Sequence, residues 1–375
     1  MSNSDWLKLA LAPSLQSASV AKLLNDYGSA TEICTASAAI LRAAGLSKLC
    51  IAAIQSPDQQ QMATTLEWLE ADDHHLIHWQ NDHYPELLRN TDQGPTCLFV
   101  SGDPELLGLP QIAIVGSRNA TPAGLEIAQH FAAHLASCGL LVTSGLALGI
   151  DAAAHSGSID GGGLTLAVLG TGPDIVYPQA NAPLAARIEH YGALVSEFAP
   201  GTAVRRHRFP QRNRIIAGLS LGTLVVEAGV QSGSLITARL AAEFGREVFA
   251  IPGSIHSPVS KGCHRLIRQG AKLVEQAADI IEEIGETVTS MIQLSQSEIE
   301  RPSVPETLSA IDPEHAKLLH YISYDPVSID TLIRRSGLTA EELSSMLLIL
   351  ELQGRVQALS GGRFQQKTLR RQPHE

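Results

Sequence analysis

Arginine dominates one window of this 375-residue chain. Between Phe198 and Glu227 there are five arginines and no carboxylate, and the window runs into the segment FPQRNRIIAGLSLGTLVVE. Guanidinium groups bind phosphates through paired hydrogen bonds, and aromatic rings between them can stack on unpaired bases. The window therefore indicates a groove for a nucleic-acid strand. Its basic and aromatic members are Arg205, Arg206, His207, Arg208, Phe209, Arg212 and Arg214.

A net charge of −11 would argue against a polyanion partner if the charge were spread evenly, but it is concentrated in one segment. Residues 275–351 hold 15 acidic and 4 basic residues, so this segment alone carries −11. The central region is nearly balanced, and its basic residues are bunched. A second bunch without any acid between Glu247 and Glu275 comprises Lys261, Arg265, Arg268 and Lys272.

Three glycine-containing loops each precede a predicted helix and could bind anions through free backbone amides. The first has Gly116 and Arg118, with Thr121 as the expected N-cap and Pro122 as the first helical residue. The pattern G-x-G-x-x-G of dinucleotide sites is absent. Several anion sites on one edge suit a chain of phosphates better than a single nucleotide. The other two loops contribute Gly145 and Gly149, then Ser232, Gly233, Ser234 and Thr237.

The acidic residues near the predicted strand ends could serve an enzyme, but each has a simpler role. Asp151 begins a helix, where a carboxylate is favoured by the helix dipole, and His155 is its i+4 neighbour. Glu227 is expected to orient loop amides, and Glu197 stands at a further strand end. No nucleophile elbow, Walker A lysine or carboxylate pair is present. The sequence therefore predicts no catalytic residue and no cofactor.

Four histidines near residue 78 raise the question of a metal site. In a helix, His74 and His78 would share one face, but Leu76 and Ile77 favour passage from a helix into a strand. No carboxylate stands at a metalloenzyme spacing. We predict no metal at His74, His75, His78 and His83.

Short apolar runs alternate with helical segments from about residue 80 to 290, which predicts an α/β fold with a doubly wound parallel sheet. Ligands of such sheets bind beyond the carboxyl ends of the strands, where the glycines gather. The predicted strands are 111–116, 140–145, 164–170, 193–198, 223–229 and 247–253.

The flanking regions differ from this pattern. Residues 1–75 are predicted to form a small helical domain of SAM or helix-hairpin-helix type, broken at Gly28, Gly45 and Pro57. The central domain spans 76–288, a polar linker 289–307, and a winged-helix domain 308–368. In that last domain Thr339 and Glu342 form a capping box. Its third helix lacks lysine and arginine, which favours protein contact over DNA contact.

The composition indicates a cytoplasmic protein. The first residues lack the basic and apolar regions of a signal peptide, and no apolar run approaches the length of a membrane span. The five cysteines contain no C-x-x-C pair, which is typical of reduced thiols.

Several segments, in order over about 160 residues, resemble the DNA-processing protein DprA (Smf) family. They are GSRNATPAG, SGLALGIDAAAH, LAVLGTG followed by YP, SEF, FPQRNRIIAGLS, VVEA, SGSLITA, REVFAIPG and KGCHRLIRQGA. The resemblance implies an extended Rossmann-like fold and a non-enzymatic protein that binds single-stranded DNA. It further implies a homodimer that protects incoming strands during natural transformation and helps to load the RecA recombinase.

The DNA pocket of the family maps onto one edge of the predicted sheet, with one departure. His264 stands where the family usually has asparagine, and a histidine can still donate a hydrogen bond to phosphate. The mapped residues are Gly116, Ser117, Arg118, Arg206, Arg208, Phe209, Arg212, Asn213, Arg214, Ser232, Gly233, Ser234, Lys261 and Gly262.

A second class of function remains open at this point. Gly222, Thr223 and Glu227 resemble part of the motif of the lysine-decarboxylase-like (LOG-type) phosphoribohydrolases, which bind and hydrolyse nucleotides. This chain lacks the proline-glycine pair of that motif and has one extra residue before the glutamate.

Overall fold

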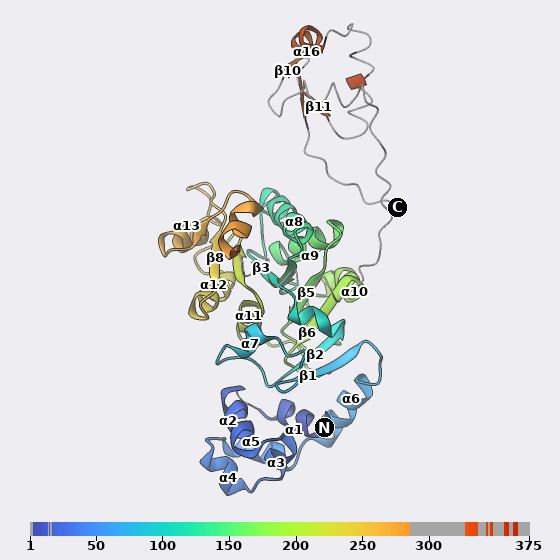
Figure 1. Cartoon of the computed structure of the whole chain (residues 1–375), viewed down its shortest axis with the longest axis vertical. Helices are drawn as coiled ribbons and strands as arrows, with labels where there is room; N and C mark the ends of the chain where they lie inside the picture. The colour runs from blue at the N-terminus through green and yellow to red at the C-terminus, as the bar shows by residue number, and fades with distance from the viewer. Residues whose placement is uncertain are drawn as a thin grey trace. The chain divides into compact units, whose positions relative to one another are not determined.

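The computed structural model divides the chain into two compact units, residues 1–299 and 300–375 (Figure 1). It describes residues 3–13, 15, 17–285, 327–336, 343, 346–347, 356–359 and 363–366. The predicted linker 289–307 lies outside the described residues.

Six short helices form the N-terminal part of the first unit and pack beside strands β1 and β2 (Figure 1). Helices end at the predicted breaks, and Gly28 and Gly45 both have the positive φ that favours glycine. Trp6, Leu23 and Ile54 share one core with Phe99 of β2, so this module is anchored to the sheet. The helices are α1 (Asn3–Leu11), α2 (Ser17–Tyr27), α3 (Ala30–Thr35), α4 (Ala38–Ala43), α5 (Lys48–Gln55) and α6 (Gln59–Trp68).

A nine-stranded sheet forms the centre of the first unit, in the order β1-β2-β6-β5-β4-β3-β7-β8-β9. The strands from β6 to β9 are parallel, while β2 pairs antiparallel with β6 and β1 antiparallel with β2. All six predicted strands are confirmed, and β1, β2 and β9 are additional. The strands are β1 (His74–His78), β2 (Cys97–Gly102), β3 (Gln111–Val115), β4 (Leu141–Ser144), β5 (Thr165–Leu169), β6 (Gly192–Ser196), β7 (Gly222–Val225), β8 (Glu247–Ala250) and β9 (Lys272–Leu273).

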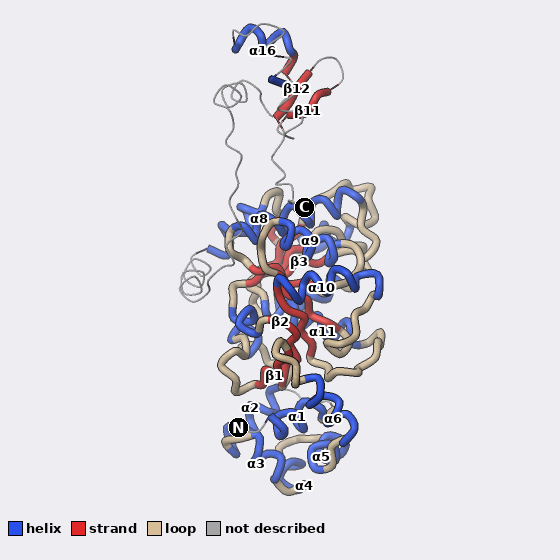
Figure 2. Tube along the Cα trace, turned by 90° about the vertical axis from the view of Figure 1, so that its right-hand side faces the viewer, coloured by secondary structure: helices blue, strands red, loops and turns tan. Residues whose placement is uncertain are grey.

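Helices cover both faces of this sheet, as the doubly wound prediction requires (Figure 2). Ile112 and Ile114 of β3 face α8, α9 and the helical residues 277–285, whereas Ala113 and Val115 face α11, α12 and α13. The helices are α7 (Glu86–Arg89), α8 (Pro122–Ser137), α9 (Ile150–Asp160), α10 (Ala182–Tyr191), α11 (Arg208–Leu219), α12 (Ser234–Glu243) and α13 (Lys261–Arg268), with 3-10 turns η1 (Pro104–Gly108) and η2 (Gln179–Asn181).

The second unit contains a three-stranded sheet of order β10-β12-β11 and the helix α16 (Ile329–Ser336). Leu332, Leu343 and Leu347 are buried there. The predicted β wing is the antiparallel pair β11 (Val356–Leu359) and β12 (Arg363–Gln366), and β10 is Val327–Ser328. The capping box of Thr339 and Glu342 falls outside the described residues.

The five cysteines are all free thiols, in agreement with the prediction from their spacing. Cys50, Cys97 and Cys263 are buried, and burial raises the pKa of the Cys263 thiol to about 11. In the described part of the chain, no helix combines the length and the apolar character that crossing a membrane would require.

Candidate nucleic-acid interface

The loops that follow β3, β4 and β7 meet at the carboxyl edge of the sheet. The chain passes outward from β3 through β4, β5 and β6 and then returns to β7 on the other side of β3, so β3 and β7 flank the switch point where such sheets bind ligands. A Cβ on Gly116 would lie 2.5 Å from Ile150, and one on Gly149, whose φ is +80°, would overlap the carbonyl oxygen of Ser117. Only glycine fits at these two close contacts, so the loops after β3 and β4 lie against each other at this edge.

Glu227 fixes the first of these loops. Its carboxylate accepts hydrogen bonds from the Thr121 amide (2.9 Å) and hydroxyl (2.6 Å), while the same hydroxyl accepts from the Gly124 amide (3.0 Å). This confirms Thr121 as the N-cap, Pro122 as the first residue of α8, and the expected loop-orienting role of Glu227. The carboxylate is thus engaged in holding the loop.

An aromatic platform lies beside these loops. The guanidinium of Arg118 lies over the ring of Phe209 at 5.5 Å, and the ring of Tyr177 lies 5.5 Å from the same ring. Phe209 is held by close contact with Gly170 after β5, while Arg118 and Tyr177 are exposed. Sequence reasoning omitted Tyr177, although it belongs to the YP pair that follows LAVLGTG. Together these groups offer two aromatic rings, tilted by 39° to each other, next to a cation, and unpaired bases can stack on such rings.

The loop before α11 carries the exposed cations of the arginine window. Arg205, Arg206 and His207 are exposed, and Arg208 stacks on Phe198 at 4.8 Å while donating a hydrogen bond to the Ala203 carbonyl (2.6 Å). Arg208 and Phe209 begin α11, so the basic loop leads directly to the platform.

The side chain of Arg212 lies inside the protein. This corrects the prediction that all five arginines of the window contact phosphates. Its side chain is 3% exposed, donates to the Val168 carbonyl, and packs so closely on Gly145 that a Cβ there would overlap it. Burial lowers the pKa of Arg212 to about 10, against the opposing effect of Asp151. Asp151 is also buried; burial raises its pKa and Arg212 opposes that rise. Arg212 and Asp151 therefore stabilise the Gly145–Gly149 loop from beneath.

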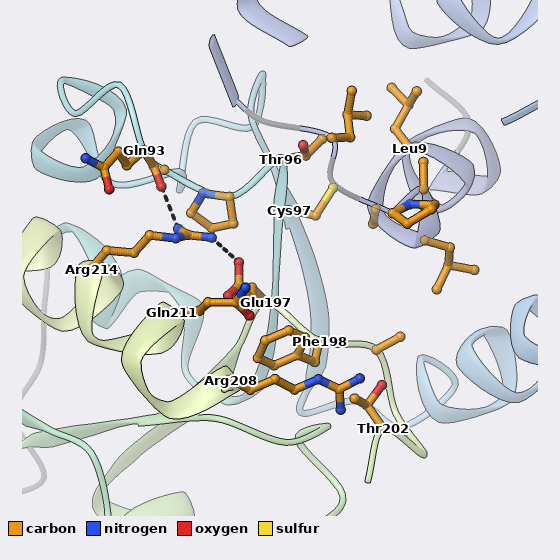
Figure 3. Close-up of a pocket in the computed structure, with 18 of the residues that line it drawn as sticks. Leu9, Gln93, Thr96, Cys97, Glu197, Phe198, Thr202, Arg208, Gln211 and Arg214 are labelled. Carbon is orange, nitrogen blue, oxygen red and sulfur yellow. Dashed lines mark hydrogen bonds and ion pairs between the residues drawn. The ribbon is translucent and has the colours of Figure 1, made fainter. Parts of the chain in front are cut away.

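Arg214 also has internal partners. It forms an ion pair with Glu197 and donates a hydrogen bond to the carbonyl of Gln93 (2.5 Å), as Figure 3 shows. Burial raises the pKa of Glu197, and the neighbouring Arg214 opposes this effect. The ion pair ties α11 to the segment after β6 and occupies a carboxylate that an enzyme could have used, and the hydrogen bond to Gln93 ties α11 to the loop before β2.

Backbone and side-chain hydrogen bonds build the β7 and β8 side of the edge. The Gly262 amide donates to the Ala228 carbonyl (2.7 Å), and the Asn213 amide group donates to the Gly233 carbonyl (3.3 Å). Ser232 and Ser234 share a hydrogen bond of 2.7 Å; Ser234 is buried, and Thr237 is 1% exposed. Lys261, which precedes Gly262 and also belongs to the mapped residues, is an exposed cation on this side of the edge.

The second basic window offers fewer available cations than its sequence indicates. Lys272 forms an ion pair with Glu283, so it is already partnered. Lys261, Arg265 and Arg268 remain exposed on α13, at the spacing of one helical face. The side chain of His264 bonds to the Gly253 carbonyl (3.0 Å), which ties α13 to the loop after β8.

His155 does not pair with Asp151, its i+4 neighbour, although such local pairing is common. The Nδ1 atom of His155 bonds instead to the Thr165 hydroxyl (2.7 Å), and the side chain is completely buried between α9 and β5. Burial, with a further contribution from Arg212, lowers the pKa of His155 to about 3. A protonated His155 is therefore strongly disfavoured in the folded protein.

This burial predicts a specific loss of stability in acid. The contribution of a neutral His155 is complete above the unfolded pKa of about 6.5 and is lost as the pH falls from there toward 3. Between pH 7.5 and pH 5, the wild type should lose about 2 kcal/mol more unfolding free energy than His155→Gln, which cannot titrate. Urea unfolding at both pH values measures this difference. Equal losses in both proteins would contradict the assignment.

His74, His75 and His78 lie in β1, so the predicted passage from a helix into a strand is confirmed, while His83 lies in the turn after β1. His74 stacks on Trp68 (3.9 Å between ring centroids) and His78 on Trp6 (4.3 Å). These stacks join β1 to helices α6 and α1. Within the described residues, no three metal-ligating side chains come together.

Two protein-family models match this chain, one in its central part and one in its C-terminal part. Residues 75–285 match the family model of DNA recombination-mediator protein A, and residues 301–362 match that of the DprA winged helix domain. The second match confirms the winged-helix expectation for the C-terminal unit.

Similar proteins include protein Smf of Escherichia coli (strain K12), with 37% identity over 358 residues, which cover 95% of this chain and 94% of that protein. The DNA processing protein DprA of Streptococcus pneumoniae is 46% identical over 203 residues, or 54% of this chain and 72% of that protein. Its X-ray structure aligns with a TM-score of 0.67 and 36% identity, covering 76% of this chain and 98% of the other.

A structure that describes the single-stranded DNA binding mode of DNA processing protein A from Helicobacter pylori is also similar. It aligns with a TM-score of 0.51 at 26% identity and covers 58% of this chain and 97% of that one.

Proposed function

Because this chain belongs to the DprA (Smf) family of DNA recombination-mediator proteins, we propose that it binds single-stranded DNA along the carboxyl edge of its sheet. The observation that carries the proposal is the platform of Phe209, Arg118 and Tyr177 beside the glycine loops. Unpaired bases expose faces that stack on such rings, whereas a duplex conceals them. The similar protein from Helicobacter pylori is described as binding single-stranded DNA, which supports the same ligand here.

The cations next to the platform would bind the phosphates. Arg118, Arg205 and Arg206 are exposed, Arg208 is half-buried, and the amides of Gly116 and Ser117 lie at the same edge. Arg212 and Arg214 would act by holding α11 and the loops in place. Lys261, Gly262 and the segment Ser232–Ser234 would extend the interface toward β8.

The number of cations that remain exposed sets the expected salt dependence. With Arg118, Arg205 and Arg206 each on one phosphate, the slope of log affinity against log salt should be about −2.1, from about −0.7 per contact on a single strand. Counting all five arginines of the window, including the two with internal partners, would instead give about −3.5. Fluorescence anisotropy of a labelled oligonucleotide at several salt concentrations measures the slope. A slope near zero would contradict phosphate binding.

Binding without catalysis is the form of function that this edge favours. Glu227 is engaged with Thr121, Glu197 with Arg214, and Asp151 is buried near Arg212. We propose that no carboxylate of this edge acts as an acid or base.

The wider role proposed for the protein rests on family membership. It would protect incoming single strands during natural transformation, act as a homodimer, and help to load the RecA recombinase in the cytoplasm. The mass of the full chain by sedimentation, with and without DNA, tests the dimer. RecA filament formation on strands coated with a single-strand binding protein tests the loading.

A competition titration tests the binding function itself. A labelled single strand is bound and then displaced by unlabelled single-stranded DNA, duplex DNA or mononucleotides. Single strands should compete much better than duplexes of the same length, and mononucleotides should fail at micromolar concentration. Efficient displacement by a mononucleotide would favour the nucleotide-hydrolysing alternative.

A further inference from the structure

A cleft of about 810 Å³ opens between the N-terminal helices and the central sheet (Figure 3). Its walls come from the end of α1, the loop before β2, the segment after β6, and the first turns of α11. Ligand sites in proteins commonly have volumes of about 300–1,000 Å³. The cleft is therefore large enough for a nucleotide-sized group.

The cleft lies next to the proposed DNA platform. Arg208 and Phe209 are consecutive residues at the start of α11, yet they face different surroundings: Phe209 contacts Gly170, Tyr177 and Arg118, whereas Arg208 stacks on Phe198 in the cleft wall. The loop that joins Thr202 of the cleft to Arg208 carries Arg205 and Arg206. A strand that leaves the platform along these cations thus reaches the mouth of the cleft.

The charge of the cleft suits a neutral group. Two basic side chains, Arg208 and Arg214, and two acidic side chains, Glu197 and Asp92, line it, and Arg214 is already paired with Glu197. A phosphate would gain little from such a balanced lining. The exposed cations at Arg205 and Arg206 would hold the phosphates outside.

The shapes and polar groups in the cleft suit a base. Arg208 presents a flat guanidinium supported by the ring of Phe198, and unpaired bases stack on such planes. Gln211, one turn further along α11, lines the cleft, and its amide group makes no hydrogen bond to the described residues. That amide can donate and accept one hydrogen bond each, as the polar edge of a base requires.

We propose that this cleft receives one unstacked base of the bound single strand, with the base stacked on the Arg208 guanidinium that Phe198 supports and hydrogen-bonded by Gln211. The inference rests on the proposed function, since the platform delivers the strand. It adds a base site outside the Phe209 platform, and to this site the N-terminal helices contribute one wall.

Hexadeoxynucleotides with the fluorescent base 2-aminopurine at successive positions test the proposal. In the full-length wild type, the position whose base enters the cleft should change its emission on binding, in addition to any position that stacks on the Phe209 platform. Gln211→Glu, which places a carboxylate in the cleft, should abolish that change and weaken binding about 10-fold. The matched control Gln60→Glu changes an exposed residue of α6 in the same way and should leave both readouts unaltered.

Phe198→Ala should weaken binding by a similar factor, with thermal unfolding recorded to show that the variant is folded. If both cleft variants kept wild-type affinity and emission while Arg118→Glu lost affinity, the assignment of the cleft as a base site would be overturned. The proposed function would remain intact. Undiminished binding by Arg118→Glu would instead contradict the proposed function. Tight binding of deoxyguanosine monophosphate alone, lost in Gln211→Glu, would assign the cleft to a free nucleotide and overturn the strand assignment.

Discussion

Arg118→Glu should lower the affinity for single-stranded DNA about 100-fold, because it removes a charge-assisted phosphate contact and places a carboxylate beside the strand. Arg118 is exposed at the switch point and lies over the ring of Phe209, so the substitution changes both the charge and the platform. Anisotropy titrations at one fixed salt concentration measure the effect. The loss should be the same for strands of different sequence, since phosphates carry no sequence information.

Arg42→Glu provides the matched control. Arg42 is an exposed residue of α4 in the N-terminal helices, so the same change of charge occurs away from the loops of the sheet edge. This control should bind within about twofold of the wild type at moderate salt, because exposed charges beyond the Debye length are screened. Equal losses in both variants would mean that net charge, and not the position of Arg118, determines binding.

Arg212→Leu should produce the largest loss of stability, about 3–5 kcal/mol of unfolding free energy. The substitution removes the cation with the largest effect on the buried Asp151, and it removes the donor to the Val168 carbonyl. Urea unfolding followed by circular dichroism measures the loss. By contrast, Arg206→Leu changes an exposed residue and should alter stability by no more than about 0.5 kcal/mol.

These two arginines also differ in what their substitution does to DNA binding. Arg206→Leu should weaken binding without unfolding the protein, whereas Arg212→Leu should act through the loss of structure. If Arg212→Leu were as stable as the wild type and yet bound DNA poorly, Arg212 would be a direct phosphate ligand, as the family mapping implies.

The parallel strands and their loops could be predicted from the sequence because both are encoded locally. Each buried strand is a short apolar run that ends near a small residue, and Thr121 with Pro122 marks the start of α8. The antiparallel strands β1 and β2 are harder to predict from the sequence. β1 has the sequence HHLIH, and the stacking of its histidines on Trp6 and Trp68 depends on residues from other helices.

The positions of the arginines show what a local sequence pattern can predict and what it cannot. Arg212, Ile215, Ile216 and Leu219 follow the i, i+3, i+4, i+7 spacing of a buried helical face, a signal that could have placed Arg212 inside. For Arg214 the sequence offers no comparable signal, because its partners Glu197 and Gln93 come from distant segments that the fold brings together. The exposed cations of the window are those in the loop before α11, and Arg208 at its first turn is half-buried.

Photocrosslinking tests the central claim most directly. A single strand with 5-iododeoxyuridine is bound to the full chain and irradiated, and the adducts are located by peptide mass spectrometry. Adducts should form on Phe209 and Tyr177, whose rings lie beside Arg118 at the sheet edge. Adducts confined to residues 300–375, with Phe209 and Tyr177 unmodified, would contradict binding at this edge.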